Sequence, residues 1–325
     1  MRLSLGLAGL LALLCVTAVA LGETSLSTHQ YRLAFTDAAS APAQILWSIR
    51  APRTAAAALV GAALGLAGAV MQGLLRNPLA DPGVLGVSAV SALGASVVIA
   101  LGLGATVGAI EGAALGGALA AGGLLTILAI RLAEPQTLIL FGVALSALGG
   151  AATALVFNLS PSPVATAEVL SWLMGSVSNR DWSDVAVGLA PATVGGALCF
   201  WSGRGLRMLT LGEETAAMSG LPMARLRAAA VAGTAMLTGA AVAMAGVIGF
   251  VGLAAPHLVR RSVSDDPAAA MLPSALAGGA LLVAADLAAR LIPSSEELKL
   301  GVVTALFGAP LFALVVWRAA RSWRG

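Results

Sequence analysis

Ten long apolar runs follow one another along the chain, and they constrain its fold more than any other feature. Each approaches the roughly 20 apolar residues that an α-helix needs to cross a bilayer. They cover about residues 3–21, 54–75, 86–109, 112–131, 136–158, 184–201, 228–245, 246–261, 272–290 and 301–318. Hydrophobic residues make up 59% of the 325 positions and charged residues only 10%, so lipid must be the main solvent. The sequence predicts an all-α, polytopic membrane protein with about ten transmembrane helices in a single domain, residues 1–325.

The character of these runs argues against a membrane β-barrel. They are continuous stretches of Ala, Leu, Gly and Val, without the period-two alternation of barrel strands. The first run follows Arg2 and ends near Ala18 and Ala20, which also fits a cleavable signal peptide. Because this run is long for a signal core, a retained first span is the favoured interpretation.

The distribution of basic residues predicts the orientation. With ten spans and a cytoplasmic N-terminus, the C-terminus is cytoplasmic as well, and twelve of the 18 basic residues lie on the inner side. These twelve are Arg2, Arg76, Arg131, Arg204, Arg207, Arg225, Arg227, Arg260, Arg261, Arg318, Arg321 and Arg324. The outer segments are then about 22–50, 159–183 and 291–300.

Sequence signals for catalysis, metal binding and nucleotide binding are absent. His29 and His257 are the only histidines, and neither has partners at metal-ligand spacing. The single lysine, Lys299, precedes a leucine, so the chain has no phosphate-binding loop ending in Lys-Ser or Lys-Thr. The sequence predicts no metal site, no catalytic residue and no nucleic-acid partner. If transport is driven by ATP, a separate polypeptide must bind the nucleotide.

Two polar inner segments contain helix breakers between long spans. The first is RNPLADPGVLG, Arg76 to Gly86, whose prolines end the preceding helix. The second, Leu211 to Arg227, is expected to form two short helices broken at Gly220 and Pro222. Glu213 and Glu214 lie in its first turn, where the helix dipole favours acids. Its charged flanks and apolar side chains suggest a docking surface, although an ordinary interfacial loop is equally compatible with this segment alone.

Three outer arginines lie close to span ends. Arg50 and Arg53 bracket a proline before the second span, where basic residues often anchor a helix at the interface. Asp286 and Arg290 are four residues apart, so they share one helix face and are expected to form an ion pair. The default interpretation of the pair is structural, and contact with a partner protein is the sharper alternative.

Four ordered motifs resemble those of one transporter family. RAPRTAAAALVGAALGLAGAVMQGLLRNPLADPGVLGVS resembles the most characteristic stretch of the FecCD-type permeases, which import vitamin B12, haem and ferric siderophores. LGEETAAMSGLP, AGVIGFVGLAAPHLVR and ADLAARLIPSSEELKLGVVTALFGAPLF match later signatures in the same order. The resemblance covers the chain from about residue 45 onward. The segment SVSDDP departs from the Gly-x-Asp-His pattern of many relatives, which leaves the contacts of Asp265 and Asp266 open.

The resemblance implies a type II ABC importer permease of the bacterial inner membrane. Such permeases pair as homodimers, bind two cytoplasmic ATPase subunits and receive substrate from a periplasmic binding protein. The permease binds no permanent cofactor, and ATP and magnesium belong to the ATPase. The implied ATPase-coupling residues are Leu211, Gly212, Glu213, Glu214, Ala217, Gly220, Leu221 and Pro222. The implied docking residues for the binding protein are Arg50, Arg53 and Arg290.

The substrate is the least constrained expectation. The sequence of the motif around Arg76 is most similar to that of haem permeases and favours haem as the substrate, with vitamin B12 or a ferric siderophore as alternatives. Two remote alternatives belong to other functional classes: an ion-driven secondary transporter using Asp286, and an intramembrane enzyme. The enzyme would need an intramembrane nucleophile or paired acids facing a cavity, and the sequence shows neither.

Overall fold

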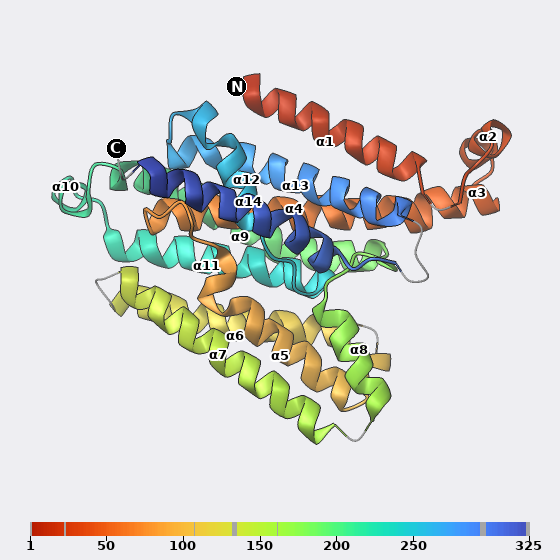
Figure 1. Cartoon of the computed structure of the whole chain (residues 1–325), viewed down its shortest axis with the longest axis horizontal. Helices are drawn as coiled ribbons and strands as arrows, with labels where there is room; N and C mark the ends of the chain where they lie inside the picture. Colours follow the sequence, from red (N-terminus) through yellow and green to blue (C-terminus); the bar gives the residue numbers. More distant parts are fainter. Residues whose placement is uncertain are drawn as a thin grey trace.

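The computed structural model describes residues 2–22, 24–106, 108–131, 135–160, 162–292 and 297–322, and within these ranges it contains helices but no strands. Long helices run roughly side by side in an elongated bundle, with α10 at one end and α2 and α3 at the other (Figure 1). Arg324, and residues 293–296 of the expected outer segment 291–300, lie outside the described ranges. The expected all-α class is confirmed.

Ten helices correspond in position to the ten apolar runs. They are α1 Arg2–Ala20, α4 Ala51–Leu74, α5 Val87–Ala100, α6 Ala109–Arg131, α7 Pro135–Leu159, α9 Trp182–Leu209, α11 Met223–Ala245, α12 Val251–Arg260, α13 Pro267–Leu291 and α14 Leu300–Ser322. The shorter elements are α2 Thr28–Thr36, α3 Ala41–Gln44, η1 Ile45–Arg50, η2 Pro82–Leu85, η3 Leu103–Ala105, α8 Pro163–Leu173, α10 Glu213–Met218 and η4 Arg261–Val263.

The expected count of ten full spans is not confirmed. Within the described residues, seven helices are long and apolar enough to cross a membrane, counting residues 41–74 as one continuous helix. Helix α5 has 14 residues, and Leu300–Pro310 of α14 also falls among the shorter apolar helices. Helix length rises by about 1.5 Å per residue, so α5 reaches only about 21 Å, less than a hydrocarbon core of about 30 Å.

The span expected over residues 246–261 is wrong as a continuous helix. Helix α11 ends at Ala245, and Gly246 has a φ of 70°, which directs the chain out of the helix. Phe250 also has a left-handed φ, 67°, before α12 begins with only 10 residues. A side chain at position 246 would lie 2.3 Å from the carbonyl oxygen of Trp172, so only glycine fits this break. This interruption could not be predicted from composition, because residues 246–250 are as apolar as those of the neighbouring helices.

A second segment that interrupts the long helices, residues 75–86, folds back into the bundle and contains only the short element η2. It leaves the end of α4 nearest α10 and returns to the middle of the molecule before α5 begins (Figure 1). Here Gly86 lies against the backbone of Gly142 in the first third of α7, and Pro82 contacts Gly252 of α12. Irregular backbone at membrane depth is tolerated where protein covers it. This re-entry explains the shortness of α5, which begins partway through the bundle.

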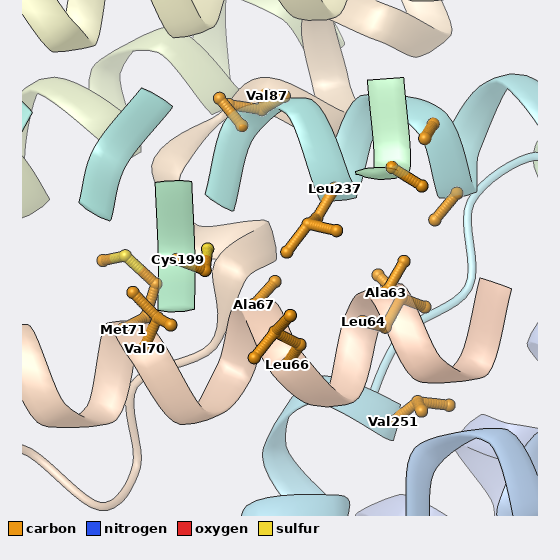
Figure 2. Packing of buried hydrophobic residues seen from close by; sticks show 14 of the residues in the cluster. Ala63, Leu64, Leu66, Ala67, Val70, Met71, Val87, Cys199, Leu237 and Val251 are labelled. Atoms are coloured by element: carbon orange, nitrogen blue, oxygen red, sulfur yellow. The ribbon is translucent and has the colours of Figure 1, made fainter. Parts of the chain in front are cut away.

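Helix α4 occupies the centre of the bundle, packed against α9, α11, α12 and α13. Figure 2 shows Ala67 of α4 facing Leu237 of α11 in the apolar core. On the opposite side, a Cβ atom at Gly61 would lie 2.3 Å from the carbonyl oxygen of Gly278 in α13. Glycine therefore permits backbone contact between α4 and α13, as small residues do between membrane helices.

The sequence GAALG occurs twice, at Gly61 to Gly65 and at Gly112 to Gly116, and the two copies lie in different surroundings. Gly61 and Gly65 both abut the backbone of α13, so the first copy permits close helix packing. The second motif, Gly112 to Gly116 in α6, has open space where Cβ atoms of its two glycines would lie. The second copy therefore makes no close helix contact within the protomer, because its glycines face outward.

Candidate functional sites at the two ends of the bundle

The chain between α9 and α11, residues 210–222, forms a tight turn that contains α10 and lies at one end of the bundle (Figure 1). We call this segment the elbow. Gly212, with a φ of 104°, starts α10, and Gly220, with a φ of 81°, follows its last turn. The amide of Leu221 then donates to the carbonyl of Ala216 over 3.2 Å, which closes the turn back onto α10. Two glycines at left-handed positions thus set the direction in which this short helix projects.

The elbow has an anchored face and an exposed face. Ala216 is buried, and Glu213 forms an ion pair of 3.1 Å with Arg227, which fixes α10 against the start of α11. Apolar Leu211 is 71% exposed and Met218 is 82% exposed, so the outer face of the elbow carries two large hydrophobic side chains. The expected coupling residues divide between the two faces: Leu211, Glu214, Ala217, Gly220 and Pro222 are exposed, whereas Gly212, Glu213 and Leu221 are half-buried.

One expectation for the elbow is corrected. Residues 211–227 contain a single short helix, α10, and not two. Pro222 occupies the N-cap position of α11, which begins at Met223 and continues to Ala245 as one helix. Proline is tolerated at a helix start, where its missing N–H leaves no hydrogen bond unmade. The second expected short helix is therefore the first turn of a full-length span.

At the α2 end, two arginines bind the carbonyl end of α1. Arg50 donates to the carbonyl of Ala20 over 2.6 Å and also to Thr24, while Arg290 donates to the carbonyl of Ala18 over 3.1 Å. The last carbonyls of a helix lack intrahelical donors and carry partial negative charge, so cations are favourable there. Arg50 is 5% exposed and Arg290 is 6% exposed, so both side chains are largely internal.

Asp286 of α13 links this arrangement to α4. Its carboxylate is fully buried and lies 2.7 Å from Arg53 and 2.9 Å from Arg290, which confirms the ion pair expected between residues 286 and 290. Arg53 also pairs with Glu297, beyond the end of α13. The three guanidinium groups and two carboxylates hold α1, α4 and α13 together. The sequence gave no signal for Glu297, because its partner is 244 residues away.

The same residues border a pocket of about 520 Å³, here called the outer arginine pocket. Its wall includes Arg50, Arg53, Arg290, Glu297 and Lys299. The structure therefore gathers all three expected docking arginines at one site, but their guanidinium groups are engaged inside the protomer. The side chain of Lys299 makes no hydrogen bond or ion pair within the described residues and adds a positive charge to the wall, while its backbone carbonyl accepts from the amides of Val302 and Val303.

Contacts of the SVSDDP segment lie at the α10 end. Asp265 pairs with Arg260, and Asp266 lies 2.8 Å from Arg207 at the end of α9. Asp266 also caps α13 by accepting from the amides of Ala268 and Ala269. Partial burial alone would raise the pKa of Asp266, but the bonds from Arg207 and the two amides outweigh it and lower the pKa. The unusual segment thus joins α9 to α13.

Within the described residues, no group of three or more His, Cys, Asp or Glu side chains is placed to hold a metal ion. The fold and the two end clusters define a multi-pass helical membrane protein with charged clusters at both ends of its bundle. The family model of the FecCD transport family matches residues 10–318, and the chain belongs to this family.

Individual relatives agree with this assignment. The chain is 39% identical over 326 residues to the vitamin B12 import system permease protein BtuC of Vibrio cholerae, covering 99% of this chain and 94% of that protein. It is 41% identical over 286 residues to the ABC transporter permease protein YvrB of Bacillus subtilis, covering 86% and 80%. A solved structure described as an inward-facing conformation of a metal-chelate type ABC transporter superposes with a TM-score of 0.87 at 29% identity, covering 98% of this chain and 99% of that one.

The protein is accordingly the permease subunit of an ABC importer, and it is not itself catalytic. ATP is hydrolysed by a separate subunit, in agreement with the missing phosphate-binding loop. Membership in this family implies ATPase partners, a second permease copy and a binding protein.

Proposed function

We propose that this permease imports a corrinoid of the vitamin B12 type. The observation that carries the proposal is the 39% identity, spread over 99% of the chain, to a permease named for vitamin B12 import. Haem, which the sequence of the motif around Arg76 favoured, has no comparable support among the relatives described above. An iron or other metal chelate is the second candidate, favoured by the metal-chelate transporter that shares the fold at 29% identity.

A competition between substrates tests this proposal. The permease, its ATPase and its binding protein are produced in cells lacking their own corrinoid, haem and siderophore importers. Uptake of labelled cobalamin, haem and a ferric siderophore is then measured separately. Cobalamin uptake that depends on the permease supports the proposal, whereas uptake of only the iron compounds refutes it. Uptake that survives loss of the ATPase but stops with an uncoupler would identify an ion-driven transporter instead.

The proposed mechanism is alternating access driven from the elbow. Two copies of the permease face each other, and one ATPase subunit grips the elbow of each. The exposed side chains of Leu211 and Met218 offer an apolar contact, and Glu214 supplies a charge at its edge. The ion pair between Glu213 and Arg227 transmits movement of α10 to α11, because it joins the two helices directly. Closure of the ATPases on ATP and magnesium then tilts the permease halves.

The outer arginine pocket is the proposed docking point for acidic side chains of the binding protein. It carries four cationic groups, Arg50, Arg53, Arg290 and Lys299, against Glu297 in its wall and the buried Asp286 behind it. A net positive, concave surface favours a carboxylate from a partner. Lys299→Glu tests the site more cleanly than arginine variants, since the side chain of Lys299 has no structural bond to lose. We expect weaker binding-protein affinity, and unchanged affinity contradicts this docking point.

This arrangement requires the α10 end to face the cytoplasm in a bacterial inner membrane, with both termini inside. Cysteine substitutions at exposed Met218 and at Thr24 in the outer arginine pocket test the orientation. An impermeant thiol reagent added to intact cells should label position 24 and spare position 218. The reverse pattern overturns the assignment.

A further inference from the structure

The end of α4 carries a charged residue in a backbone conformation that favours glycine. Arg76 has a φ of 49° and follows the C-cap residue Leu75. The amide of Asn77 donates to the carbonyl of Gln72 over 3.2 Å, which closes the helix end around Arg76. This hydrogen-bond pattern usually places glycine where Arg76 lies. Residues in strained backbone conformations cluster at functional sites, so the surroundings of Arg76 are a place to look for one.

Arg76 borders a cavity of about 290 Å³ at the α10 end of the bundle. The cavity lies among the ends of α4, α9, α12 and α13, and its wall includes Gln72, Arg76, Arg260, Asp265 and Asp266. Gln72 is 8% exposed, and its side-chain nitrogen Nε2 has no acceptor. A buried donor without an acceptor is costly, so the wall contains an unmet hydrogen-bonding requirement.

The charges of the wall leave one cation unbalanced. Asp265 is paired with Arg260, and Asp266 is occupied by Arg207 and by the first amides of α13. Arg76 makes no ion pair or hydrogen bond within the described residues. One free guanidinium and one unsatisfied amide donor therefore border the same cavity, and both are groups that bind oxygen anions.

We propose that this cavity binds a phosphate-type oxyanion. The planar guanidinium of Arg76 can hold two of its oxygens in a bidentate arrangement, and the amide of Gln72 can donate to an oxygen of the same group. The wall carboxylates do not repel the anion strongly, because each is already neutralised by an arginine. The anion is either free phosphate or the headgroup phosphate of an anionic lipid, since basic pockets between membrane helices bind such headgroups. The site is independent of the substrate that the permease carries.

Arg76→Gly provides the test, because glycine suits the left-handed backbone and the substitution removes the whole side chain with its guanidinium. Arg76→Lys is the conservative variant, and Arg204→Ala removes an exposed arginine from α9 that is not part of the cavity wall. The nucleotide-free transporter complex is held in phosphatidylcholine nanodiscs. Native mass spectrometry measures retained phosphatidylglycerol, and phosphorus NMR line broadening measures binding of inorganic phosphate.

We expect Arg76→Gly to lower the affinity for one of these two anions by about tenfold or more, which is the loss typical of a charged hydrogen bond. Arg76→Lys should retain part of the binding, and Arg204→Ala all of it. Loss of phosphatidylglycerol identifies a lipid site, and loss of inorganic phosphate alone identifies a site for a soluble anion. The proposal is overturned if Arg76→Gly binds both anions like the wild type, or if Arg204→Ala loses as much. Equal anion binding combined with loss of the ATPase from the Arg76→Gly complex would assign Arg76 to a protein contact instead.

Discussion

Removing the negative charge of Asp286 should destabilise the permease more than removing any exposed acid. Asp286→Asn keeps the size of the side chain but takes away the partner of two guanidinium groups, at 2.7 Å and 2.9 Å. The side chain of Arg290 is only 4% exposed and cannot recover this loss through water. Breaking one buried pair costs about 3–5 kcal/mol. Arg53 keeps Glu297 as a partner, so we expect about 3 kcal/mol in total and not twice that.

The assay is thermal unfolding of the purified permease in nanodiscs, with Asp265→Asn as the matched control. Asp265 also pairs with an arginine, but its side chain is 65% exposed, so its loss should cost less than about 1 kcal/mol. At roughly 2 °C or more per kcal/mol for a chain of this size, Asp286→Asn should melt about 6 °C or more below the wild type. In a double-mutant cycle with Arg290→Gln, the two losses should be non-additive by about 1 kcal/mol or more. Melting within about 1 °C of the wild type, or strict additivity, refutes the assignment of this pair as a buried structural link.

Three further predictions concern other parts of the bundle. Gly61→Val should separate α4 from α13, because its Cβ would meet the carbonyl of Gly278 at 2.3 Å; membrane-inserted protein should fall sharply, whereas Gly112→Val, facing open space, should insert normally. Met218→Asp should reduce uptake and stimulated ATP hydrolysis together while leaving the melting midpoint unchanged, and uptake at the wild-type rate would contradict a coupling role for the elbow. The pKa of Asp266 is lower in the folded protein than its value of about 4 in the unfolded chain, so the carboxylate stabilises the fold above about pH 4 and this stabilisation is lost as the pH falls through the folded-state pKa. Asp266→Asn should therefore make the free energy of unfolding depend less on pH in the acid range. An unchanged pH dependence contradicts the role of Asp266 as a cap.

Hydropathy and helix breakers predicted much of this fold because burial in lipid demands apolar helices of fixed length. The positions of nearly all the long helices followed from that requirement alone. The interruption at residues 246–250 did not, because Gly246 and Phe250 leave the helix through their backbone angles while remaining apolar. The re-entry of residues 75–86 was also invisible, since its depth depends on contacts with Gly142 and Gly252, which lie far away in sequence.

The candidate sites were predicted unevenly for a related reason. The elbow was predicted from local signals in the sequence: glycines, a proline, and charged residues beside apolar ones. The outer arginines were found as positions, but their internal engagement depends on acceptors such as Ala18, which is 272 residues from Arg290. A carbonyl oxygen carries no sequence signature, because every residue has one. Helix-end binding by arginine therefore becomes visible only when the chain is folded.

The attachment of α1 has a consequence for biogenesis. Most of this helix faces outward, its main helix neighbour is α13, and Arg50 and Arg290 of α13 donate to its last carbonyls. During synthesis α1 enters the membrane first, yet Arg290 is made only after nearly nine-tenths of the chain has been produced. Until α13 arrives, the first span is therefore held at one end by Arg50 but lacks its main helix neighbour. A ribosome stalled before residue 290 should leave α1 open to membrane chaperones and proteases, and release of the complete chain should end that exposure.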